Sequence, residues 1–134
     1  MLITIEFLEE WDFTKKLPVT VRTYEIISEY KKFKNHLTKN NINIEDYIMN
    51  KFLKNKKYSI EQNNFPYNIT DNMAHYVLWI EPNYFKEIND KQLLEIILIK
   101  MNELGYNEYF CFENHIGCKS VLGIPHYQVF FRKC

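Results

Sequence analysis

Glycine, proline and cysteine are all scarce in this chain of 134 residues. It contains three glycines, four prolines and three cysteines. Because no stretch is rich in Gly, Pro or Ser, nothing marks a flexible linker, and the length suits one domain over residues 1–134. An odd number of cysteines without a CxxC pair excludes an even disulfide framework and offers no zinc-ligand spacing. We therefore expect no metal and no cofactor.

An excess of charge is also missing, since 17 lysines and arginines balance 17 aspartates and glutamates. A chain without net charge is not expected to attract nucleic acid or an anionic membrane through its overall field. No apolar run approaches the ~20 residues of a membrane helix, and no signal-peptide pattern opens the chain. We expect a cytoplasmic protein that holds any anionic ligand by local geometry.

Apolar residues make up 46% of the chain and aromatic residues 16%, which predicts a packed core. Residues 1–58 form the helical part. A helix is predicted from about residue 20 to 37, because apolar side chains recur there at helical spacing. That stripe consists of Tyr24, Ile27, Tyr30, Phe33 and Leu37. Asn43 is a typical N-cap residue and predicts the start of a second helix.

Residues 59–134 are typical of a sheet with one helix. Strands are predicted at 56–62, 74–81, 106–114 and 124–132, where β-branched and aromatic residues lie between turn signals. A helix between them begins at Asn89 or Asp90 and ends at Gly105, a natural C-terminal stop. The order of helices, two strands, helix and two strands predicts an α+β fold with an antiparallel sheet and packed helices.

The strongest candidate for chemistry is the run GIPHYQVFF at 123–131, in which His126 stands two residues before Gln128. Side chains alternate along a strand, so His126, Gln128 and Phe130 share one face. His75 opens the strand HYVLWI in a similar position. A fold that brings these strands together would place two imidazoles and one amide on a single open face.

Other interpretations of the same residues stay open. The runs HYVL and HYQV resemble the two-histidine phosphoesterases, which carry His-x-Thr/Ser twice, but Val77 and Gln128 occupy the hydroxyl positions. Metal binding by His75, His126 and a cysteine has no supporting ligand spacing. Each histidine is also explained by a purely structural role beside a shallow groove.

Two longer blocks resemble a known superfamily. The stretch NNFPYNITDNMAHYVLWIEP at 63–82 resembles the histidine-triad (HIT) pattern, in which Asn-x-Phe-Pro and a turn precede a strand that opens with His. FEN at 112–114 and IPHYQVF at 124–130 are similar to its galactose-1-phosphate uridylyltransferase branch, although Ile124 replaces the first triad histidine. Over its full length the chain also resembles an uncharacterised domain family that includes fungal N-acetylglucosamine-induced proteins.

The resemblance assigns roles to five residues. It implies that His126 is a covalent nucleophile, that Gln128 binds the phosphoryl-histidine intermediate, and that His75 orients a group or transfers a proton. Asn114 and Ser120 would bind phosphate oxygens. The implied function is hydrolysis or transfer of a nucleotide-type phosphoester without metal, in a HIT-like fold over residues 59–134. The resemblance is also compatible with a homodimer, because triad proteins often pair through sheet edges.

The alternative function belongs to a different class. The chain contains ten tyrosines and ten phenylalanines, so an aromatic surface could bind a protein partner in a domain that kept the HIT-like fold without catalysis.

Overall fold

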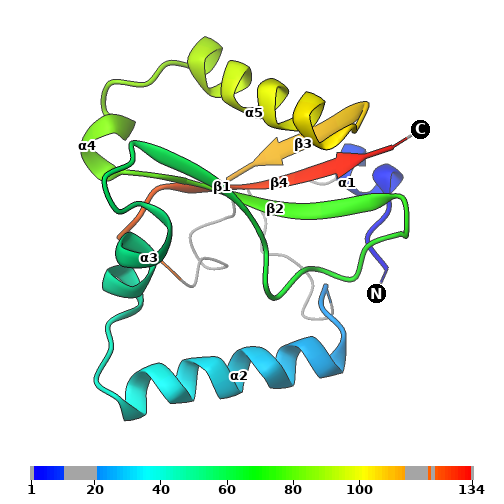
Figure 1. Ribbon diagram of the computed structural model, residues 1–134. Coiled ribbons are helices and arrows are strands. Elements are labelled where there is room, and N and C mark those ends of the chain that lie inside the picture. Colours follow the sequence, from blue (N-terminus) through cyan, green and yellow to red (C-terminus); the bar gives the residue numbers. More distant parts are fainter. Residues whose placement is uncertain (1, 11–20, 114–120, 122, 134) are drawn as a thin grey trace.

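The centre of the protein is a four-stranded antiparallel sheet with strand order β1-β2-β4-β3 (Figure 1). A computed structural model describes residues 2–10, 21–113, 121 and 123–133. The strands are β1 Tyr58–Gln62, β2 Met73–Ile80, β3 Glu108–Phe112 and β4 His126–Arg132. Each lies within or next to the segment predicted from the sequence, and the α+β class is confirmed.

Helices cover both faces of this sheet (Figure 1). Helix α5 lies along one face, and α2 and α3 lie on the opposite side. The helices of the described residues are α1 Ile5–Glu10, α2 Tyr24–Lys39, α3 Ile44–Phe52, α4 Pro82–Phe85 and α5 Asp90–Leu104. Sequence periodicity did not predict α1 and α4, because helices this short present too few turns for a repeat to be recognised.

Local capping explains where the two helices beside the sheet begin and end. The Asn43 side chain accepts hydrogen bonds from two N–H groups in the first turn of α3. Asn89 and Gln92 form a capping box at the start of α5, and Gly105 ends that helix in the left-handed region at φ +80°. These groups satisfy backbone donors and acceptors that a helix end leaves open, so the predicted boundaries are confirmed.

The main apolar core lies between α5 and the sheet. Successive side chains of a strand point to opposite faces, and one set from each central strand packs against α5. This core comprises Ile60, Leu78, Ile80, Ile97, Met101, Val129 and Phe131. This core buries the apolar side chains of α5 and of one face of the sheet. The polar residues of the central strands lie on the opposite face.

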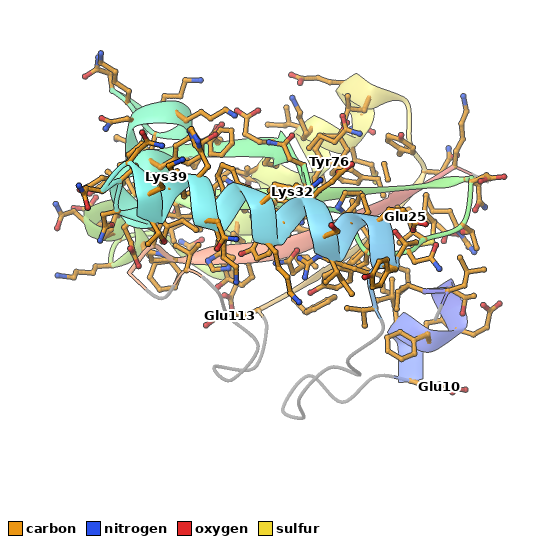
Figure 2. All side chains as sticks on the ribbon, turned by 90° about the horizontal axis from the view of Figure 1, so that it is seen from below. Glu10, Glu25, Lys32, Lys39, Tyr76 and Glu113 are labelled. Atoms are coloured by element: carbon orange, nitrogen blue, oxygen red, sulfur yellow. The ribbon has the colours of Figure 1, made fainter. Side chains whose placement is uncertain are left out.

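On that other face, α3 packs closely and α2 less so. Ile48 of α3 joins a buried cluster with Val77 and Trp79 of β2. Helix α2 crosses the same side of the molecule, as Figure 2 shows from below, and its buried residue is Leu37. Tyr24, predicted to belong to the apolar stripe, is 83% exposed, so that prediction is wrong. Periodicity identifies a helix face but not how many turns of it contact a neighbour.

Candidate functional site

The pairing of β2 with β4 brings the predicted chemical residues onto one face of the sheet. Trp79 lies opposite His126, and Val77 lies opposite Gln128. His75 is two residues from Val77 and therefore shares that face. The expected open face is nevertheless covered, because His75 is only 2% exposed and His126 and Gln128 are each 6% exposed.

The orientation of the His126 ring is fixed by the backbone just before it. Its Nδ1 lies 2.8 Å from the carbonyl oxygen of Ile124. A carbonyl only accepts, so Nδ1 carries the proton and donates it, and in the neutral ring Nε2 then carries the lone pair. Thus the main chain at Ile124 orients the His126 ring. The ring also packs beside Trp79, with centroids 4.8 Å apart.

His75 is held in the opposite tautomer. The backbone N–H of Tyr67 donates to Nδ1 of His75 at 3.1 Å, so the ring proton is on Nε2. This Nε2–H donates to Oε1 of Gln128 at 2.5 Å. Burial, together with the positive charge of Arg22, lowers the pKa of His75 to about 3 against the raising effect of the Gln128 bond. The ring is therefore neutral near pH 7, which favours an orienting role over proton transfer.

Aromatic rings clamp His75 in this position. It stacks on Phe130 with ring centroids 4.3 Å apart, and Tyr67 lies 4.6 Å away on centroids. The locked imidazole in turn fixes the Gln128 carboxamide. Because the amide oxygen of Gln128 accepts from His75, the NH₂ end is the one able to bind acceptor atoms of a ligand. The network thus makes Gln128 a hydrogen-bond donor for the pocket that it lines.

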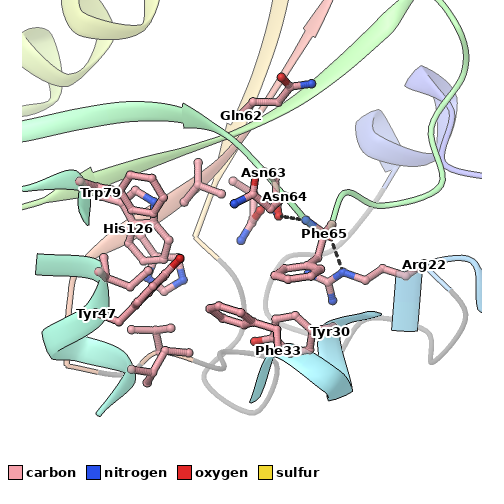
Figure 3. A pocket seen from close by; sticks show the side chains of 16 residues that line it. Arg22, Tyr30, Phe33, Tyr47, Gln62, Asn63, Asn64, Phe65, Trp79 and His126 are labelled. Atoms are coloured by element: carbon pink, nitrogen blue, oxygen red, sulfur yellow. Dashed lines mark hydrogen bonds between the residues drawn. The ribbon is translucent and has the colours of Figure 1, made fainter. Parts of the chain in front are cut away.

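That pocket has a volume of about 90 Å³ and lies between the sheet and helices α2 and α3 (Figure 3). Six of its sixteen lining residues are Phe, Tyr or Trp. The aromatic residues are Tyr30, Phe33, Tyr47, Phe52, Phe65 and Trp79. Its polar groups are the carboxamides of residues 62–64 together with Arg22, His126 and Gln128. An apolar wall with a few polar groups is typical of small-molecule sites.

Arg22 is the cationic side chain among the described residues that line this pocket. Its Nε donates to the carbonyl of Phe65 at 2.7 Å, and its guanidinium lies 4.8 Å from the Tyr67 ring centroid and 5.5 Å from that of Tyr30. No carboxylate of the described residues forms an ion pair with it. Figure 3 shows Arg22 and His126 on opposite sides of the pocket.

Three of the five predicted site residues, His75, His126 and Gln128, lie on one face of the sheet, and His75 is hydrogen-bonded to Gln128. Of these three, His126 and Gln128 line the pocket and His75 does not. Asn114 and Ser120 lie outside the described residues. Sequence reasoning missed Arg22 and the aromatic wall, because these residues come from separate segments: the residue before α2, α2 itself, α3, residues 62–65 and β2. No local sequence motif predicts that these segments come together in the fold. A single arginine before a helix does not indicate a binding site.

In the part of the chain that the structure describes, no group of three or more His, Cys, Asp or Glu side chains is placed to hold a metal ion. Nor does any helix within the described ranges have the length and apolar character needed to cross a membrane.

The fold and the pocket define a small α+β protein with one aromatic, histidine-containing site. A family model described as "Protein of unknown function (DUF3605)" matches residues 8–132, so the chain belongs to this family. The expected resemblance to an uncharacterised family along nearly the whole chain is confirmed in this general form. No curated protein matches the chain.

One solved structure is similar in fold. It is described as "Crystal Structure of HTC1" and matches with a TM-score of 0.60 at 18% sequence identity. The match covers 86% of this chain and 77% of that chain. At this level of identity the likeness shows a shared fold alone.

Proposed function

We propose that the pocket binds a nucleotide-type phosphoester and that Nε2 of His126 attacks its phosphorus atom. The observation that carries this proposal is the 2.8 Å hydrogen bond between His126 Nδ1 and the Ile124 carbonyl. This bond holds the neutral tautomer in which the lone pair is on Nε2, and His126 lines the pocket.

The pocket offers suitable partners for both ends of such a ligand. The aromatic wall suits a nucleobase, and stacking of a base on an aromatic side chain is worth about 1–3 kcal/mol. The NH₂ group of Gln128 suits a phosphoryl oxygen, because its own carbonyl oxygen is engaged by His75. A donor placed where negative charge develops stabilises the transition state in a site with little water.

The reaction divides into two displacements at phosphorus. In the first, the lone pair on His126 Nε2 forms an N–P bond, and the P–O bond to the leaving group breaks with its electron pair on oxygen. That oxygen takes a proton from solvent. In the second, water or a second phosphate attacks phosphorus, the N–P bond breaks, and its electron pair returns to Nε2; attacking water releases its proton to solvent. The Ile124 carbonyl accepts the Nδ1–H throughout, which steadies the cationic ring of the intermediate.

We further propose kinship with the HIT superfamily. The similarity of residues 63–132 to its sequence blocks supports this, as does the pairing of the two histidine strands. On this proposal His75 is a positioning residue, not the proton donor, because its ring is locked as a neutral Nε2–H tautomer. The likeness to N-acetylglucosamine-induced fungal proteins suggests nucleotide sugars as one part of any substrate panel.

A covalent adduct provides the test. The protein is mixed with a panel of labelled nucleotides and nucleotide sugars, quenched in base, and analysed by intact mass and peptide mapping. We expect an acid-labile nucleotidyl group on the peptide that contains His126. The variant His126→Asn should form none while keeping the wild-type circular dichroism spectrum.

His36 supplies a matched control, since it is exposed on α2 and does not line the pocket. His36→Asn should form the adduct at the wild-type rate. Absence of both adduct and turnover across the panel would refute the catalytic proposal. A protein that captures a partner equally well with His126→Asn would instead favour the non-catalytic interaction domain.

A further inference from the structure

The chain has no net charge, but its basic and acidic residues are unevenly distributed along the sequence. Residues 21–57, which include α2 and α3, contain nine lysines and arginines against four aspartates and glutamates, a surplus of five. The rest of the chain has the remaining eight basic residues against thirteen acidic ones. Helices α2 and α3 themselves carry five lysines against four acidic residues, so most of this surplus lies beside them, at Arg22 before α2 and at Lys54, Lys56 and Lys57 after α3.

Two of these lysines lie next to aromatic rings of the pocket. The ammonium of Lys34 is 4.5 Å from the ring centroid of Tyr30. The ammonium of Lys51 is 5.3 Å from that of Tyr47 and donates a hydrogen bond to its hydroxyl at 2.9 Å. Both lysines are exposed, and neither forms an ion pair with a carboxylate of the described residues.

These lysines belong to different ends of the pocket. Lys34 contacts Tyr30, the ring over which Arg22 also lies. Lys51 contacts the rings of Tyr47 and Phe52, and Phe52 stacks on Trp79 next to His126. Figure 3 shows Tyr47 near His126 and Tyr30 near Arg22, on opposite sides of the pocket. Positive charge therefore flanks the aromatic wall on both sides.

From this arrangement we infer that the phosphoester is part of a single-stranded oligonucleotide, one nucleotide of which occupies the pocket while neighbouring phosphates bind Lys51 on one side and Arg22 with Lys34 on the other. This inference rests on the proposed function and specifies its substrate. Cations that follow the backbone, combined with aromatic platforms for bases, are the common solution for binding single strands. A mononucleotide offers phosphate to only one of the two charged ends.

The test compares a short single-stranded RNA, the matching DNA and the mononucleotide by competition against a fluorescent oligonucleotide at increasing salt. We expect the oligonucleotides to bind on the order of tenfold more tightly than the mononucleotide at low salt. With three cations contacting phosphate, the logarithm of affinity should fall against the logarithm of salt with a slope of about −2, at ~0.7 per contact.

The double variant Lys34→Gln/Lys51→Gln isolates the flanking charges. It should reduce the slope for oligonucleotides to about −0.7 and weaken their binding on the order of tenfold, while mononucleotide binding weakens by a smaller factor because its phosphate meets only one of the two charged ends. Lys86→Gln/Lys91→Gln is the matched control, because both lysines are exposed and distant in the fold, after α4 and in α5. It should behave as wild type.

Three results would overturn the inference. Equal, salt-insensitive binding of mononucleotide and oligonucleotide would refute it while leaving the proposed function intact. An equal loss of oligonucleotide affinity in the control variant would overturn it, because it would show that oligonucleotides are attracted to surface lysines in general. Binding of neither ligand would contradict the inference and the proposed function together. Oligonucleotide binding without an adduct on His126 would support the ligand class and refute the chemistry.

Discussion

Acidification should destabilise the protein through one residue, His75. Its pKa in the folded protein is about 3, compared with an ordinary value of 6.5. Between these pH values the unfolded chain binds a proton at this position and the folded chain does not. The free energy of unfolding must therefore fall as the pH drops below about 6.5, and the loss is complete near pH 3.

The size of this loss of unfolding free energy follows from the difference between the two pKa values. At about 1.4 kcal/mol for each pH unit, the full loss is roughly 5 kcal/mol. That is comparable to the whole stability of many single domains, which is about 5–15 kcal/mol. The cause is structural, since protonation would place a charge between Tyr67 and Phe130 and remove the acceptor of the Tyr67 N–H.

Urea unfolding followed by circular dichroism at a series of pH values measures this effect. The comparison is His75→Phe, which keeps an aromatic ring between its neighbours but cannot titrate. At neutral pH this variant should be less stable by about 1–3 kcal/mol, because the Tyr67 N–H loses its acceptor. As the pH falls, the wild type should lose more stability than the variant, so that the two curves converge near about pH 5.

His36→Gln provides the control, because it removes an exposed histidine while leaving His75 in place. This variant should keep the wild-type dependence on pH. The reasoning would be refuted if wild type and His75→Phe lost stability in parallel between neutral and acidic pH.

Three further outcomes follow from single positions. Gln128→Glu should keep the bond from His75 Nε2–H but replace the NH₂ donor with an oxygen that repels phosphate, so calorimetry should show nucleotide binding weakened at least on the order of tenfold; unchanged affinity would contradict the donor role. Because residue 128 is buried, the variant should also be less stable in urea unfolding. Burial raises the pKa of Cys111 to about 12, so iodoacetamide should leave this thiol unmodified in the folded protein at neutral pH, and rapid labelling on peptide mapping would be inconsistent with it. Gly105→Ala should cost about 1 kcal/mol in urea unfolding because φ is +80° there, whereas no atom lies within 4 Å of the added methyl; a stabilised variant would rule out backbone strain.

Sequence alone predicted the elements whose signals are local. The alternation of apolar residues and the caps at Asn43, Asn89 and Gly105 mark strands and helix ends within a few residues of where they occur. It also predicted that His126 and Gln128 share a face, since strand geometry requires this.

The contact between His75 and Gln128 could not be predicted, because these residues are 53 positions apart. It depends on the β2–β4 register, which no pattern in either strand specifies on its own. Arg22 was missed for a similar reason, since its partner is a backbone carbonyl at Phe65. The expected openness of the histidine face was wrong, because the approach of α2 and α3 is a matter of tertiary packing.

A crystal structure of the protein soaked with a nucleoside monophosphate would test the central claim most directly. We predict density for the nucleotide in the pocket, with its phosphorus next to His126 Nε2 and a phosphate oxygen accepting from the Gln128 amide. A nucleotide bound elsewhere, or a His126 ring turned so that Nδ1 leaves the Ile124 carbonyl and Nε2 faces away from phosphorus, would contradict it.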